Sequence, residues 1–186
     1  IKYIEEIRDT FLKIEINDYR HKTLSFDKAI ALVVKEVIAR SKKGNKVIFI
    51  GNGGSASIAS HLTIDFLKNA NIPAVSFNDS SLLTCIGNDL GYEYVFQKPI
   101  EMLSKKMDIL FSISSSGRSK NILNATKKAK EKGCFIITLS GFDRDNPLRR
   151  LGDINFYVPS NFYGYVEIIH LVICHCIVDT IINNKH

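Results

Sequence analysis

Short apolar runs recur along the chain, separated by longer stretches in which apolar and polar residues mix. Each run has four to six residues, is rich in Val, Ile and Phe, and shows no strict alternation with polar residues. This pattern is typical of strands in a parallel sheet that is covered on both faces. The predicted strands are Lys46–Ile50, Ala74–Phe77, Ile109–Ile113, Cys134–Leu139 and Ile154–Val158.

Helical periodicity fills the segments around these runs. Ser55–Leu67 and Ser119–Lys132 place apolar residues three and four positions apart. Two further helices are predicted before the first strand, over Tyr3–Tyr19 and Ser25–Ser41, as an N-terminal helical extension of about residues 1–42. Alternating strands and helices predict an α/β fold with a five-stranded, parallel, doubly wound sheet flanked by helices, in a single domain over residues 1–186.

A long helix is predicted to close the chain, over Tyr163–Ile182. Its residues are apolar almost all round, with few polar positions to face water. A helix of this kind must be buried on most sides. The sequence leaves open whether the core of its own domain or other subunits bury it.

The composition is that of a globular protein. The chain has 186 residues, of which 45% are hydrophobic and 24% are charged. No uninterrupted run of eighteen apolar residues exists, so no membrane span is expected. The charged N-terminal segment does not resemble a secretory signal. The cysteines lack the spacing of a disulfide framework, so free thiols in a cytoplasmic protein are expected. They are Cys85, Cys134, Cys174 and Cys176.

The formal net charge of +6 raises the question of nucleic-acid binding. The lysines occur in short groups on the predicted polar faces of helices, with acidic residues among them. No long basic run interleaved with aromatic residues appears, as binding to a single strand would favour. We therefore expect no nucleic-acid partner, and we interpret the charge as solvated helix faces that also attract an anionic substrate.

Two loops rich in glycine and serine follow predicted strands and precede predicted helices. They are Gly51–Ser55, with the sequence G-N-G-G-S, and the segment after Ile113, with the sequence S-S-S-G-R-S. Glycine lets the backbone approach an anion, and a helix N-terminus offers free N–H groups. In doubly wound sheets, ligands bind beyond the carboxyl ends of the strands. The two loops together predict an anion site, whereas the absence of G-x-G-x-x-G and P-loop spacing disfavours a nucleotide-dependent oxidoreductase.

These two loops, together with Gly87-Asn88-Asp89 between them, identify a resemblance. The chain resembles the sugar isomerase (SIS) domain family, in its phosphoheptose isomerase branch, over nearly its whole length. The resemblance implies a cytoplasmic homotetramer that isomerises a phosphorylated sugar, most simply sedoheptulose 7-phosphate or a related heptose phosphate for lipopolysaccharide or capsule synthesis. The substrate-binding positions it implies are Asn52, Gly53, Gly54, Ser55, Asp89, Ser114, Ser115, Ser116, Ser119 and Glu167.

The helix after Ser55 carries a candidate acid–base or metal pair. His61 and Asp65 are four residues apart and share one face, so they could reach one metal ion, handle a proton, or form an ordinary surface contact. The family has His-x-x-x-Glu here as part of a zinc site, and it has a Gln and a His that match Glu167 and His175. The resemblance thus implies zinc held by His61, Asp65, Glu167 and His175. It makes Asp65 the carbon base and His175 the partner for the oxygen.

Several positions depart from the family pattern, among them Arg118 in place of Asn and Tyr165 in place of Arg. Asp65 replaces Glu, Asn69 replaces Arg, and Glu167 replaces Gln. The added charge of Glu167 could offset the shorter carboxylate of Asp65 at a metal site. Eight helical residues between Glu167 and His175 span about 12 Å, so either the helix bends or two subunits supply the ligands. A non-catalytic module that binds a phosphosugar or a protein is therefore kept as the alternative function.

Overall fold

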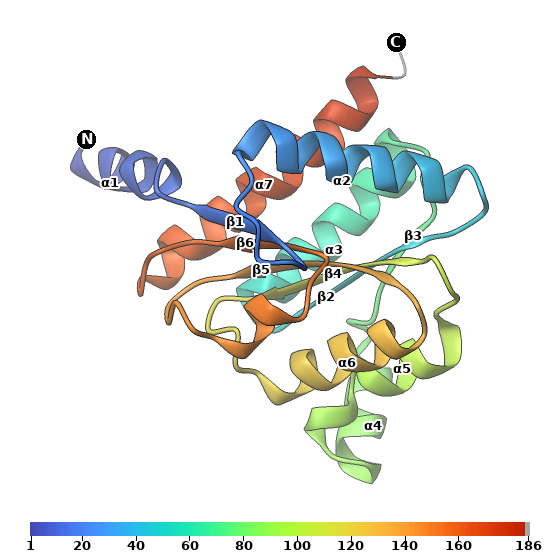
Figure 1. The fold of residues 1–186 in the computed structure, drawn as a ribbon. Coiled ribbons are helices and arrows are strands. Elements are labelled where there is room, and N and C mark those ends of the chain that lie inside the picture. The colour runs from blue at the N-terminus through green and yellow to red at the C-terminus, as the bar shows by residue number, and fades with distance from the viewer. Residues whose placement is uncertain (185–186) are drawn as a thin grey trace.

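The computed structural model, which describes residues 1–184, contains one six-stranded sheet between two layers of helices (Figure 1). The strand order is β1-β6-β5-β4-β2-β3. The five strands β2 to β6 pair in parallel, as predicted, and β1 pairs with β6 in the antiparallel sense. The strands are β1 Glu15–Asp18, β2 Val47–Gly51, β3 Ala74–Ser76, β4 Ile109–Ser114, β5 Phe135–Ser140 and β6 Ile154–Tyr157.

The helices divide between the two faces of the sheet (Figure 1). Helices α2, α3 and α7 cover one face, and α4, α5 and α6 lie over the other. The helices are α1 Lys2–Phe11, α2 Phe26–Ser41, α3 Gly54–Ile64, α4 Ser80–Asp89, α5 Gln97–Leu103, α6 Lys120–Glu131 and α7 Tyr163–Asn183. One π-helical turn, η1 (Asp65–Asn69), continues α3, and two short 3₁₀ turns, η2 (Tyr92–Tyr94) and η3 (Pro147–Arg150), lie in the loops.

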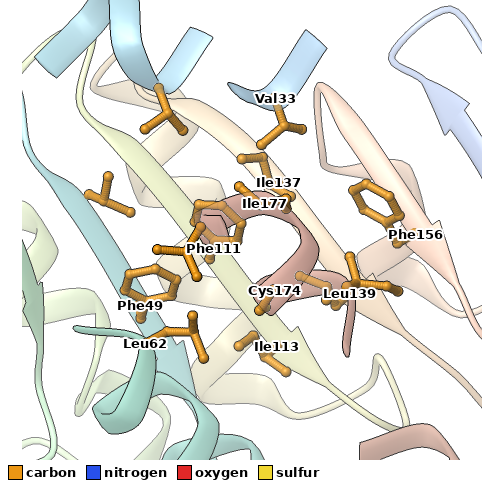
Figure 2. Packing of buried hydrophobic residues seen from close by; sticks show 14 of the residues in the cluster. Val33, Phe49, Leu62, Phe111, Ile113, Ile137, Leu139, Phe156, Cys174 and Ile177 are labelled. Atoms are coloured by element: carbon orange, nitrogen blue, oxygen red, sulfur yellow. The ribbon is translucent and has the colours of Figure 1, made fainter. Parts of the chain in front are cut away.

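The sheet is buried on both faces, which explains the lack of alternation in the sequence. Along β2, Val47 and Phe49 point to the α2/α3/α7 side, and Ile48 and Ile50 point to the α5/α6 side. The first of these two cores contains the aromatic contact between Phe49 and Phe111, whose ring centroids are 4.8 Å apart (Figure 2). Both faces therefore select mainly large apolar side chains. The polar residues inside the strands are hydrogen-bonded, as Ser112 is to Thr126 and Thr138 to Asn155.

The predicted helix over Tyr3–Tyr19 is wrong beyond Phe11. Helix α1 ends there, and Glu15–Asp18 forms the edge strand β1. Ile16 is the one buried residue of this strand. Four residues with one apolar anchor are too short a pattern for period-two alternation to stand out. The predicted N-terminal extension thus contributes a strand as well as helices.

Helix α7 is long and apolar enough to cross a membrane by length and composition alone. The criterion of eighteen uninterrupted apolar residues does not identify this helix, because Glu167, His170 and His175 interrupt its apolar sequence. In the fold α7 packs against α2, α3 and the sheet. Its buried residues are Val166, Ile169, His170, Ile173, Cys174, Ile177, Val178 and Ile181. One side of α7 is therefore buried in the core of its own chain.

Asp108 joins the starts of β2 and β4. Its carboxylate accepts hydrogen bonds from the backbone N–H groups of Lys46 and Lys105, and it forms an ion pair with the Lys46 ammonium. Burial acts to raise the pKa of Asp108, but these hydrogen bonds outweigh it and hold the pKa below its usual range. The ionised carboxylate therefore stabilises the fold above its unfolded pKa, and this contribution is lost as the pH falls through the folded pKa.

We expect Asp108→Ala to lower the free energy of unfolding by about 3 kcal/mol at pH 7, because it leaves a charged partner and backbone donors unpaired. Urea unfolding monitored by circular dichroism measures the loss. Asp145→Ala is the matched control, since the Asp145 side chain is 85% exposed. A loss below about 1 kcal/mol, the scale of an exposed ion pair, would contradict this role.

Candidate active site

The two glycine- and serine-rich loops meet where the strand order reverses. β2 continues to β3 on one side, while β4, β5 and β6 follow on the other. The crevice between β2 and β4 is thus the topological switch point, where open α/β sheets bind ligands. A cavity of about 340 Å³ lies there. It is lined by Asn52, Gly53, Gly54, Ser55, Ser114, Ser115, Ser116, Ser119, Tyr163 and Glu167.

Gly54, the first residue of α3, faces a carboxylate. A Cβ built on Gly54 would lie 2.4 Å from Oε2 of Glu167 and 2.5 Å from its Oε1. Any side chain at this position would displace Glu167. The absence of a side chain therefore brings Glu167 of α7 directly against the N-terminal backbone of α3.

The serine loop offers several hydroxyl groups to the cavity. Ser114 Oγ accepts a hydrogen bond from Gly117 N, and Ser116 Oγ accepts one from Arg118 N, so each hydroxyl proton remains available to a ligand. Ser119 is the N-cap of α6 but its side chain makes no capping hydrogen bond. Ser115 Oγ is buried and has no partner among the described residues. Buried hydroxyls normally find partners, so this loop is poised to bind a polar ligand.

Asn146 fixes the loop that follows β5 and packs against Gly117 of the serine loop. This fully buried residue donates to Ser140 Oγ and to the carbonyl oxygens of Gly141 and Asp143. It lies so close to Gly117, which has φ +60°, that a Cβ there would be 2.0 Å from Asn146 Oδ1. Gly117 is therefore required both for its backbone conformation and for its contact with Asn146. Sequence patterns did not reveal Asn146, which looks like an ordinary loop residue.

Asn52 is fixed by a second polar network. Its amide exchanges two hydrogen bonds with Asn121 of α6, at 2.9 and 2.8 Å, and its Oδ1 also accepts from the Tyr92 hydroxyl at 3.2 Å. Asn121 is buried. The orientation of Asn52 at the cavity is thereby set before any ligand arrives. Neither Asn121 nor Tyr92 was predicted from the sequence.

Asp65 and two histidines come together between α3 and α7. Oδ2 of Asp65 lies 3.4 Å from Nε2 of His61 and 3.9 Å from Nδ1 of His175. The two imidazole rings pack edge to face with centroids 5.3 Å apart. One ligand atom from each of the three residues lies within 4.8 Å of the others. Within the described residues, these three are the predicted metal and acid–base positions that converge.

The other oxygen of Asp65 is held by Asn69. Asn69 Nδ2 donates to Asp65 Oδ1 at 3.0 Å. Both residues belong to η1, the π-helical turn that follows α3. Such turns are frequent at functional sites. In this turn, Asp65 Oδ1 accepts the hydrogen bond from Asn69, and Asp65 Oδ2 faces His61 and His175.

Two other side chains of α7 belong to the core. His170 is fully buried, and its Nε2–H donates to the Ser140 carbonyl at 3.2 Å. Burial lowers the pKa of His170 to about 4, so its ring is neutral at pH 7. Burial likewise raises the pKa of Cys174 to about 12, so its thiol is inert. Neither group is available for chemistry at the cavity.

Two predicted residues lie outside the positions expected for them. Glu167 lines the loop cavity but does not belong to the cluster of His61, Asp65 and His175. Asp89 is exposed at the end of α4, where Asn88 Nδ2 donates to it, and it does not line the cavity. Conversely, Tyr163 lines the cavity although no sequence pattern pointed to it.

A larger cavity of about 930 Å³ lies beside β1 and the loop before η3, and it contains none of the predicted positions. Its arginines are already engaged. Arg144 and Arg149 both form ion pairs with Glu15, and Arg150 pairs with Asp145. Burial acts to raise the pKa of Glu15, but the two guanidinium groups hold it below its usual range. The arginines of this cavity thus serve ion pairs of the fold. The smaller cavity is the better candidate, because it lies at the switch point of the sheet and is lined by both glycine- and serine-rich loops.

Known proteins resemble this chain in both sequence and structure. The family model of the SIS domain matches residues 2–141. A phosphoheptose isomerase of Helicobacter hepaticus is 35% identical over 181 residues, covering 92% of this chain and 92% of that protein. One of Haemophilus ducreyi is 38% identical over 184 residues, covering 91% and 93%. The solved phosphoheptose isomerase of Francisella tularensis superposes with a TM-score of 0.84 at 30% identity, covering 99% of this chain and 96% of that one. The chain belongs to the SIS domain family, in its phosphoheptose isomerase branch.

Proposed function

We infer that this chain is an aldose–ketose isomerase acting on a phosphorylated sugar. The observation that carries the inference is the pairing of a glycine- and serine-lined cavity with a His–Asp–His cluster on the same two helices, α3 and α7. The relatives named phosphoheptose isomerase cover nearly the whole chain at 35–38% identity. A heptose phosphate is consistent both with this site and with these relatives. Sedoheptulose 7-phosphate is the first substrate to test. Its product would serve lipopolysaccharide or capsule synthesis in the cytoplasm.

One group of residues is assigned to binding the phosphate, and another to proton transfer. The hydroxyls of Ser114, Ser116 and Ser119 bind the phosphate together with the backbone at the start of α3. Isomerisation needs one group to move a proton from carbon and another to serve the neighbouring oxygen. Asp65 is assigned the first role and His175 the second. Their 3.9 Å separation suits two groups that act on adjacent atoms of one substrate.

The donor set of His61, Asp65 and His175 fits a divalent metal such as zinc. Two imidazoles and one carboxylate oxygen are the ligands of many catalytic zinc sites, which keep a further position open. The separations of 3.4 and 3.9 Å from Asp65 Oδ2 to the ring nitrogens suit atoms that share one ion. When bound, the metal would supply Lewis acidity toward the sugar oxygens. Glu167 is not part of this set within one chain, and as a ligand it would have to come from another subunit.

Two measurements test the proposed function. Metal analysis of the purified protein should find close to one divalent ion per chain. An isomerisation assay against phosphorylated sugars of five, six and seven carbons should find turnover with a seven-carbon ketose phosphate. Phosphosugar binding without turnover on any member of the panel would favour the alternative, a non-catalytic phosphosugar-binding module.

We also propose that the protein is a homotetramer. Apolar side chains remain exposed on the two helices that carry the cluster, with 56% of Ile64, 46% of Leu67, 38% of Ile168 and 39% of Val172 accessible. Ile64 directly precedes Asp65, and Val172 lies one helical turn before His175. A second subunit packed here would cover this surface and close the site against water.

Light scattering at micromolar concentration should therefore give a mass about four times that of the 21.0 kDa chain. Val172→Glu combined with Ile64→Glu should shift the protein to smaller species, because it places charges in the apolar contact. Lys127→Glu, on an exposed position of α6 at the other face of the sheet, is the control for a surface charge change. A monomeric wild-type protein would contradict the proposal.

A further inference from the structure

Tyr163 presents an aromatic side chain to the loop cavity. It is the first residue of α7, and it lines the cavity together with Glu167, which follows one helical turn later. Tyr163 is 62% exposed, and within residues 1–184 its hydroxyl has no hydrogen-bond partner. The side chain can therefore be reached by a ligand, and its hydroxyl is free to bind one.

Phe142 packs against the Tyr163 ring. The two ring centroids are 4.8 Å apart and the ring planes meet at 81°, which is an edge-to-face contact. Phe142 has φ +57°, in the left-handed region that is unfavourable for a bulky side chain. Its N–H donates to the Ser160 carbonyl at 3.0 Å, and its carbonyl accepts from the Tyr157 hydroxyl at 2.9 Å. The surrounding chain thus maintains a strained backbone conformation, and such strain is concentrated at functional sites.

The residue before Phe142 connects this contact to the serine loop. Gly141 N donates to the Ser115 carbonyl at 2.9 Å. A Cβ on Gly141 would lie 2.8 Å from Cγ1 of Val166, so this loop packs closely against the first turn of α7. The Tyr163 ring is therefore held in a fixed place relative to the serine loop before any ligand binds.

The chemistry of Tyr163 suits the sugar part of the substrate. The face of an aromatic ring carries negative partial charge, which disfavours a phosphate dianion. The same face packs against C–H groups, and the phenol hydroxyl both donates to and accepts from other hydroxyls. The phosphate has its own donors in this cavity, which are the serine hydroxyls and the N–H groups at the start of α3.

We propose that Tyr163 is a substrate-binding residue that contacts the carbon chain and hydroxyls of the sugar next to its phosphate, and that Phe142 is a positioning residue that holds the Tyr163 ring at the cavity. This inference rests on the proposed function, because it takes the cavity to be the phosphosugar site. A side chain that is fixed in advance loses little conformational entropy when the substrate binds, so the contact contributes more fully to affinity.

Titration calorimetry with sedoheptulose 7-phosphate and with inorganic phosphate tests the role of Tyr163. Tyr163→Ala should weaken binding of the sugar phosphate about tenfold, because it removes a hydrogen bond and an apolar contact. It should leave the affinity for inorganic phosphate unchanged. Tyr163→Phe keeps the ring and its packing, and should lose about threefold, the scale of one neutral hydrogen bond. Tyr19→Ala is the matched control, since Tyr19 is exposed and does not line the cavity.

Phe142→Asn tests the positioning role. Asn tolerates positive φ, so the backbone conformation is kept while the ring is removed. This variant should weaken binding of the sugar phosphate about threefold in the wild-type background and should add nothing to Tyr163→Ala, because both changes act through one contact. Its affinity for inorganic phosphate should stay unchanged, whereas a general disturbance of the serine loop would lower it. Additive losses in the double variant would overturn the positioning role.

Circular dichroism establishes that each variant is folded. Wild-type affinity for sedoheptulose 7-phosphate in folded Tyr163→Ala would overturn the inference, and so would an equal loss of affinity for inorganic phosphate. Failure of the wild-type protein to bind the sugar phosphate would overturn the proposed function, and this inference with it.

Discussion

Replacing Asp65 with Asn, or His175 with Gln, is expected to lower kcat of the isomerase reaction by a factor of about 100 or more. That is the usual contribution of a positioned general acid or base. Each change keeps the size of the side chain and removes its ability to exchange a proton at the reacting atoms. The measurement is steady-state turnover of a seven-carbon ketose phosphate.

Binding should separate this chemical role from a structural one. On α3 and η1, His61 and Asp65 lie six and ten residues beyond Ser55, the last residue of the glycine loop. Inorganic phosphate should therefore bind both variants as it binds the wild type. His21→Asn is a suitable control, because His21 is exposed, is not part of the cluster, and has φ +61°, a conformation that Asn tolerates. If both cluster variants retain more than a tenth of wild-type turnover, the assignment of acid–base roles is wrong.

The double variant Ser116→Ala with Ser119→Ala should weaken binding of the phosphorylated sugar about 100-fold. A hydrogen bond to a charged group contributes about 1.5–3 kcal/mol, so two of them amount to at least about 3 kcal/mol. The fold should tolerate the change, because Ser119 makes no capping bond and Ser116 Oγ only accepts one from Arg118 N. Titration calorimetry with the sugar phosphate measures the effect.

The matched control replaces two serines that lie away from the cavity. Ser80→Ala with Ser81→Ala changes exposed residues at the start of α4, where the capping bond comes from Asp79. This control should leave affinity unchanged. Wild-type affinity in the Ser116/Ser119 double variant would remove the serine loop from the binding site.

Much of the fold could be predicted because four of the five parallel strands, β2, β4, β5 and β6, are buried along almost their whole length. Burial on both sides selects continuous apolar runs, which are visible in the sequence without any partner information. The edge strand β1 has only one buried residue. Its residues were therefore included in the helix predicted over Tyr3–Tyr19. Its pairing with β6 joins residues about 140 positions apart, and no local pattern encodes such a contact.

The candidate site shows the same division. The glycine- and serine-rich loops could be recognised from their composition. His61 and Asp65 could be paired because helix geometry places residues four positions apart on one face. The position of Glu167 could not be predicted. The family match assigns it to the metal ligands, whereas a straight helix places it about 12 Å from His175. The contribution of Asn69 also required the structure, because it depends on a π-helical turn that changes the residue spacing after α3.

Both edges of the sheet are poorly suited to further strand pairing, which bears on how copies of this protein can aggregate. At one edge, the chain folds back on β1, with Leu24 N bonded to Ile16 O and Asp18 N bonded to Lys22 O. At the other edge, β3 has only three residues and follows Pro73. Edge strands that are short or already bonded are poor templates for the backbone of another molecule. Ordered self-association is therefore left to the helix surfaces, and fibril growth by edge addition would first require local unfolding.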